Sequence, residues 1–173
     1  MPKRAPRRNE FKLTTPNSDA AKGWLKEADR FLKHAESQLS GDHADSVAHS
    51  SKTIEFAAKG ILALTGIAFP ESHRIGQRLA LAWPVLIGGS ASQLRKAKRH
   101  IARVGWLCDV VAPLQSISEY GYAGKRARFV VNQTDAVTFH KYGQECLGIA
   151  NAIASNLTNG TFRLSEGPDR TAE

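Results

Sequence analysis

Apolar residues recur at helical spacing along most of the chain. In a first segment, from Ser18 or Asp19 to Gly41, they return every three or four residues, which predicts an amphipathic helix. Ser18 or Asp19 is a good N-cap and Gly41 a good helix end. A second helix is predicted from about Asp42 to Leu64, with small residues in its middle that suit close helix packing. The first apolar stripe comprises Trp24, Leu25, Ala28, Phe31, Leu32, Ala35 and Leu39, and the second Val47, Ile54, Ala57 or Ala58, and Ile61.

The chain then breaks at Gly66 and Pro70. Glycine can take the left-handed conformation that ends a helix, and proline cannot continue one. We predict that a short third helix begins near His73 and that this histidine fixes the hinge through a local hydrogen bond. Pro84 and the Gly-Gly-Ser segment 88–90 interrupt that helix.

Two further long helices are predicted in the second half of the chain. Apolar residues from Leu94 to Val111 alternate in steps of three and four, so one stripe is buried and the rest of the helix is exposed. This helix should end near Pro113 or in the segment that follows it. Residues 129–131 suggest a brief extended piece, and the segment 133–160 reads as the last helix, with Thr134 as a plausible cap.

These elements predict an all-α protein, an antiparallel four- to five-helix bundle joined by short connections. The bundle should occupy residues 18–159. Residues 1–17 carry several prolines and no apolar period, so we expect a disordered basic arm. Residues 160–173 are expected to form a polar tail.

Charge adds a functional expectation to this fold. The chain has a net charge of +8, and the excess lies in the first 12 residues and in residues 90–132, where eight basic residues face only Asp109 and Glu119. Localised positive charge favours a polyanionic partner, most often a nucleic acid. The alternative is a solvated basic surface that aids solubility.

Several other classes of protein are disfavoured. No apolar run approaches the roughly 20 residues that span a bilayer, so no membrane segment is expected. Cys108 and Cys146 lack metal-site spacing and suggest core thiols in a reducing cytoplasm. No two histidines have the spacing of a helical metal pair with a nearby carboxylate, so no metal is expected. No glycine-rich phosphate loop indicates a nucleotide cofactor.

The order of the motifs resembles the HEPN family, small α-helical bundles that are widespread in prokaryotes. The matching features are the amphipathic helix AKGWLKEADRFLKHAESQL, the helix AHSSKTIEFAAKGILALTG, the hinge Gly66-x-x-x-Pro70-x-x-His73, and the SEYGY loop before an alanine-rich last helix. The resemblance covers residues 19–157 and implies an HEPN-like bundle. It also implies a homodimer, association with RNA or nucleotides, and a nucleotidyltransferase or antitoxin partner in a toxin–antitoxin or defence system.

Catalytic members of that family carry an arginine followed, after four to six residues, by a histidine, and two protomers or domains combine these residues in one metal-independent endoribonuclease site. Arg95 and His100 match this spacing. The histidine would move a proton at the ribose hydroxyl, and the arginine would hold the phosphate. However, five residues on a helix turn the direction by about 140°, and Lys96 stands where the family usually has Asn, Asp or His.

Three functions therefore stay open. The first is a module that binds RNA or nucleotides, the second an endoribonuclease that uses Arg95 and His100, and the third a structural oligomer that docks an acidic protein. Exposed aromatics beside basic residues in the loop 120–129 could stack bases or pack on the bundle. The candidate binding residues are Arg95, Lys96, Lys98, Arg99, Arg103, Lys125, Arg126 and Arg128.

Overall fold

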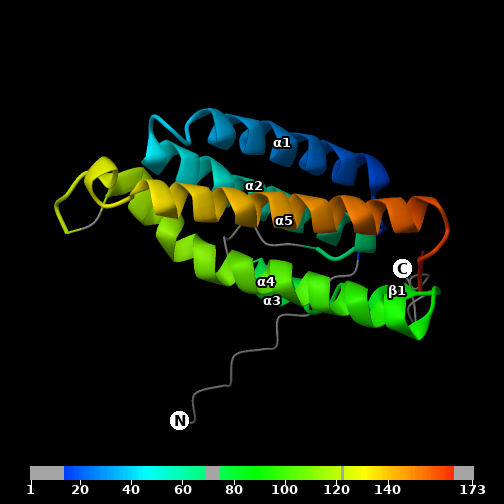
Figure 1. Ribbon diagram of the computed structural model, residues 1–173. Coiled ribbons are helices and arrows are strands. Elements are labelled where there is room, and N and C mark those ends of the chain that lie inside the picture. The colour runs from blue at the N-terminus through cyan, green and yellow to red at the C-terminus, as the bar shows by residue number, and fades with distance from the viewer. Residues whose placement is uncertain (1–13, 69–74, 122, 166–173) are drawn as a thin grey trace, which may run out of the picture.

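The computed structural model describes residues 14–68, 75–121 and 123–165. Four long helices form the bundle, and shorter elements connect them (Figure 1). The long helices are α1 (Ser18–Ser37), α2 (His43–Thr65), α4 (Ala91–Tyr120) and α5 (Gln133–Thr158). The short elements are α3 (Gly76–Leu79), the 3-10 helices Trp83–Val85 and Ala127–Phe129, and the strands β1 (Leu86–Ile87) and β2 (Arg163–Leu164).

Neighbouring long helices run antiparallel, α1 against α2 and α4 against α5 (Figure 1). The predicted all-α bundle is confirmed. Polar side chains cap the helices and thereby satisfy backbone N–H groups that have no partner within the helix. Asn17 rather than Ser18 or Asp19 caps α1, because its side-chain oxygen accepts from the Ala20 amide at 2.8 Å. Asn132 rather than Thr134 caps α5.

Helix α2 forms the centre of the fold and contacts α1, α4 and α5. Fourteen of its 23 residues are buried, and most of these are Ala, Ser, Gly or Thr. A helix that is covered on several sides can approach its neighbours closely only where its side chains are small. Most of the buried serine and threonine hydroxyls of α2 donate to carbonyl oxygens, whereas the Ser50 hydroxyl has no hydrogen-bond partner among the described residues. Ser46, for example, donates to the Ala35 carbonyl of α1 at 2.8 Å.

The break after α2 is built around Gly66, which ends the helix in the left-handed conformation, at φ 68°. The segment just before α1 packs here, because the amides of Thr14 and Asn17 donate to the carbonyls of Gly66 and Ala63. The expected disordered arm therefore does not extend through residue 17, and its residues 1–13 lie outside the described residues. Pro70 and the predicted helix start at 73 also lie outside them.

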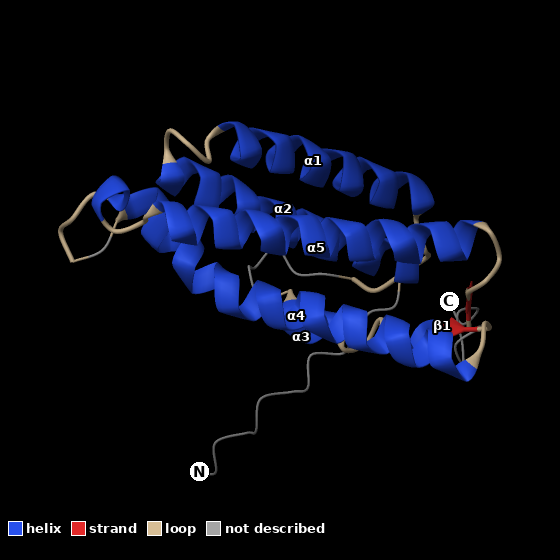
Figure 2. Cartoon of the chain, in the orientation of Figure 1, coloured by secondary structure: helices blue, strands red, loops and turns tan. Residues whose placement is uncertain are grey.

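Helix α4 continues through position 113 and ends at Tyr120, within the segment where the sequence placed its end as the second possibility. Two other boundaries differ from the sequence-based expectation. Residues 127–129 form a 3-10 helix, not an extended piece. The expected polar tail begins inside the fold, because Phe162 is only 3% exposed and β2 pairs with β1 in an antiparallel two-stranded sheet (Figure 2). Burial of the Phe162 ring is the physical reason that this segment folds back.

A close approach of α3 and α4 provides a test of this packing. A Cβ at Gly76 would collide with the Gly105 carbonyl oxygen and the Asp109 carboxylate. We expect Gly76→Ala to lower the free energy of unfolding by about 1–3 kcal/mol, the usual range for overpacking. Gly23→Ala in α1 is the matched control, since no atom lies within 4 Å of its added methyl group. That change should stabilise the protein by about 0.5–1 kcal/mol in urea titrations. Equal changes in the unfolding free energy of the two variants would contradict the close approach of α3 and α4.

A buried histidine provides a second test. His140 on α5 is 6% exposed, and its Nδ1 has no hydrogen-bond partner among the described residues. Burial lowers its pKa from the ordinary 6.5, while Glu36 opposes the shift. The unfolded chain therefore binds the proton more readily, and stability should fall as the pH drops from 6.5 toward the folded pKa.

We expect His140→Leu to lose less unfolding free energy between about pH 7.5 and about pH 5 than the wild type does. The comparison uses the change in unfolding free energy with pH for each protein. Any difference in packing that is already present at the higher pH therefore cancels. A slope that the substitution leaves unchanged would show that His140 does not titrate in this range.

Candidate nucleic-acid interface

Helix α4 has a buried side and a basic side. Ser90 caps it and forms a reciprocal capping box with Gln93, so the helix starts sharply at Ala91. Its buried stripe packs against the bundle, and the remaining positions of its first three turns carry the basic side chains. The stripe comprises Ala97, Ile101, Val104, Leu107 and Cys108, each at most 6% exposed.

Four of the predicted binding residues are exposed cations on this helix, namely Arg95, Lys96, Lys98 and Arg99. No carboxylate of the described chain lies within 4.0 Å of their charged nitrogens. Arg95, Lys98 and Arg99 line a shared hollow of about 490 Å³ together with Ser92. This hollow offers three positive charges without an internal counter-ion, which suits a phosphate group.

An aromatic ring contacts one of the cations that line this hollow. The Lys98 ammonium lies 4.4 Å from the centroid of the Trp83 ring, a distance at which a cation is attracted to the ring face. Trp83 belongs to the short 3-10 helix before β1. No periodicity in the sequence brings Trp83 to α4, and only the folding of the connection between α2 and α4 does so.

Arg103 differs from the other predicted cations because its charge is compensated. Its Nε and Nη2 donate to the two carboxylate oxygens of Glu145 at 3.1 and 3.2 Å. This hydrogen bonding, with the negative charge of Glu145, raises the pKa of Arg103. Its guanidinium also lies 4.8 Å from the centroid of the Trp106 ring, which is 51% exposed. Arg103 therefore does not belong to the uncompensated group.

The predicted catalytic pair is not brought together within one chain. His100 is half-buried and lines a hollow of about 260 Å³ beside α5, together with Lys96 and Asn156. Arg95 lines the other hollow, with Lys98 and Arg99. The angular separation of five residues along a regular helix accounts for this divergence.

The basic loop forms a second, separate region. Arg126 and Arg128 line a groove of about 650 Å³ with Tyr120 and the beginning of α2, while Lys125 is exposed nearby in the sequence. Tyr120, which lines this groove, is the last residue of α4, whereas Arg95 and Arg99 lie in its first turns. The 21 residue steps from Arg99 to Tyr120 span about 32 Å of helix. The predicted binding residues therefore lie in two separate regions.

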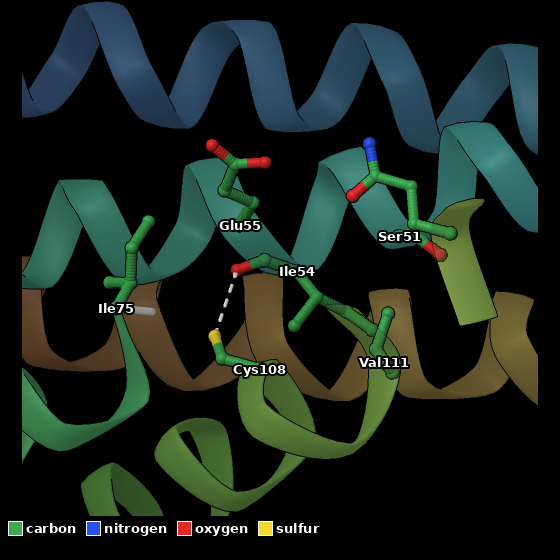
Figure 3. A pocket seen from close by; sticks show the side chains of 7 residues that line it. Ser51, Ile54, Glu55, Ile75, Cys108 and Val111 are labelled. Atoms are coloured by element: carbon green, nitrogen blue, oxygen red, sulfur yellow. Dashed lines mark hydrogen bonds between the residues drawn. The ribbon is translucent and has the colours of Figure 1, made fainter. Parts of the chain in front are cut away.

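The cavity between α2 and α4 is too small to hold a ligand. Figure 3 shows this cavity, which is lined by Ile54, Ile75 and Cys108 among others and has a volume of about 10 Å³. Such a space is at the lower limit for one water molecule. The Cys108 thiol lies 4.0 Å from the Ile54 carbonyl oxygen. Burial raises its pKa to about 12, and burial also raises the pKa of Cys146, so neither thiol is a reactive nucleophile.

No two histidines have the sequence spacing of a helical metal pair, but folding brings two histidines from different helices together with an aspartate. His34 on α1 comes to lie beside His49 and Asp45 on α2. Only the four-residue separation of Asp45 and His49 is a signal that can be read in the sequence, since His34 reaches them through the tertiary packing of two helices.

No helix in the described part of the chain combines the length and apolar character that crossing a bilayer requires. In comparisons with known proteins, neither a curated protein nor a solved structure matches the chain. The family model of the HEPN domain matches residues 21–154, which include most of α1, all of α2 and α4, and most of α5. That match extends over well more than half of the sequence, and the chain therefore belongs to the HEPN domain family.

Proposed function

We propose that this HEPN domain binds RNA through the basic side of α4. The observation that carries the proposal is that the cations of α4 and those of α1 differ in their ion pairing. On α1, Arg30 lies 2.6 Å from Glu27 and Lys33 lies 2.6 Å from Asp29, so each of these two cations has a carboxylate one turn away. On α4, four successive cations have no carboxylate partner among the described residues. Uncompensated cations gain most when a polyanion replaces their counter-ions.

Aromatic side chains next to these cations favour a single-stranded ligand. Trp83 contacts Lys98, which lines the hollow with Arg95 and Arg99, and Trp106 lies farther along α4 with half of its surface exposed. Unpaired bases stack on such rings, whereas bases within a duplex are already stacked. A strand along α4 would place phosphates at the hollow and a base at Trp106.

The test is titration of a labelled single-stranded RNA of roughly 20 nucleotides at several salt concentrations. We expect the double variant Arg95→Ala/Arg99→Ala to bind more weakly at low salt. Its plot of log affinity against log salt should be shallower by about 1.4, since each lost phosphate contact removes about 0.7. The matched control is Arg30→Ala/Lys33→Ala, which removes the same charge from α1. Equal weakening by both variants would mean that net charge alone matters.

A second candidate is a metal-independent endoribonuclease that uses Arg95 and His100. The sharing of one hollow by His100 and Lys96 favours it, because an imidazole and an ammonium group there could act on one phosphodiester. Since Arg95 lines a different hollow, the pair requires a second protomer to complete the site. This candidate therefore includes a homodimer.

Cleavage of RNA in the presence of a chelator is the measurement that decides between binding and catalysis. For a composite site, Arg95→Ala and His100→Ala should each abolish cleavage, and mixing the two variants should restore part of it, because mixed dimers regain one complete site. Persistent cleavage in either variant would refute the assignment of this pair. Binding without cleavage by the wild type would leave the RNA-binding module as the function.

Exposed apolar side chains favour a third candidate, a protein contact on α4. Trp106 is 51% exposed and Val110 is 39% exposed, and they lie four residues apart on the helix. The occupant could be a second copy of the chain or an acidic partner such as a nucleotidyltransferase or an antitoxin. Co-expression with the neighbouring gene product tests this candidate. It is supported over RNA binding if the two proteins form a stable complex that buries residues 95–103 and excludes RNA.

A further inference from the structure

Two histidines and an aspartate form a cluster at the turn between α1 and α2. His34 lies in the last turn of α1, and Asp45 and His49 lie in the first two turns of α2. The Nε2 atom of His34 is 2.9 Å from one carboxylate oxygen of Asp45, and the Nδ1 atom of His49 is 3.1 Å from the other. One nitrogen from each ring and one carboxylate oxygen all lie within 4.8 Å of one another.

The fold holds these three residues in register. Asp45 and His49 are four residues apart and therefore share one face of α2. The buried hydroxyl of Ser46 donates to the Ala35 carbonyl, which fixes α1 against α2 one residue away from His34. The rings of His34 and His49 lie 4.0 Å apart between centroids, and Phe31 lies against His49 at 5.6 Å. The cluster thus stands on two packed helices and not on a loop.

From this arrangement we propose that the cluster binds a divalent transition metal ion, with zinc as the ion of best fit. Two imidazoles and one carboxylate are donors typical of zinc, whereas magnesium and calcium prefer oxygen ligands. Tetrahedral zinc at 2.0–2.1 Å from its donors places them about 3.4 Å apart. Donors that already lie within 4.8 Å reach this spacing by small rotations of partly exposed side chains.

The His49 ring must change its hydrogen bonding when the metal binds. Its Nδ1 lies 3.0 Å from the Asp45 carbonyl oxygen as well as near the carboxylate. Ligation through Nδ1 requires the tautomer that carries its proton on Nε2, so this contact no longer serves as a hydrogen bond. Metal coordination replaces it, and the metal takes the place of the protons between Asp45 and the two rings.

Three protein ligands leave at least one coordination position open. Asp45 and His49 line the groove of about 650 Å³ that Arg126 and Arg128 also line. The nearby cation Lys52 is paired with Glu119 at 3.6 Å, which reduces its repulsion of a metal ion. The open position faces this groove and is available to water or to an anion such as phosphate, which the two arginines attract. The site is distinct from the cations of α4.

The experiment uses the full chain without a histidine tag. Zinc chloride is titrated calorimetrically, and cobalt chloride is titrated with detection of the visible absorption bands that report its coordination. We expect one ion per chain at this site, and we expect His34→Gln and His49→Gln each to weaken zinc binding by at least about ten-fold. Asp45→Asn should also weaken it. Magnesium chloride should give no binding at the cluster.

His100→Gln is the matched control, because it removes a histidine from α4 and leaves the cluster intact. It should bind zinc as the wild type does. Circular dichroism confirms that each variant keeps its helices, and His34 is a suitable test residue because its side chain is 48% exposed. The proposal is overturned if the wild type binds no zinc, or if His34→Gln/His49→Gln binds it as tightly as His100→Gln.

Discussion

The structure depends on close packing around helix α2. This helix contacts three other long helices, and its buried positions are largely Ala, Ser, Gly and Thr, so the neighbouring backbones come near. Leu25 of α1 lies directly over Gly60, and a methyl group at that glycine would meet the leucine side chain. Such packing leaves only about 10 Å³ in the cavity between α2 and α4. The larger hollows among the described residues are more open, and they line the outside of the bundle.

Helix α4 carries much of that surface and separates it into distinct regions. Its first turns present uncompensated cations, its middle presents Arg103 bound to Glu145, and its end borders the groove of Arg126 and Arg128. About 32 Å of helix separates the two ends, so a small ligand at one end does not reach the other. The two ends are therefore separate candidate sites, one proposed for an RNA strand and the other for a metal ion with an anion.

Polar groups between the helices have a positioning role. Buried hydroxyls cost free energy unless they are hydrogen-bonded. In α2 some of them donate to carbonyls of the same helix, as Ser51 does to Val47, while Ser46 donates across to α1. A bond across the interface is satisfied at only one relative position of the two helices. The pairing of His34 with Asp45 and His49 follows from that fixed register.

The sequence by itself determined the helices, the buried stripe of α4, and the family, because periodicity, capping residues and turn glycines act over a few neighbouring residues. It also located the cations on α4. Only the tertiary structure decided which charges stay uncompensated, since Glu145 reaches Arg103 across 42 positions. The divergence of Arg95 from His100 already follows from their five-residue separation on one helix. Only the tertiary structure, by contrast, decided the meeting of His34 with His49. Such outcomes depend on how helices face one another, and local sequence patterns do not encode that relation.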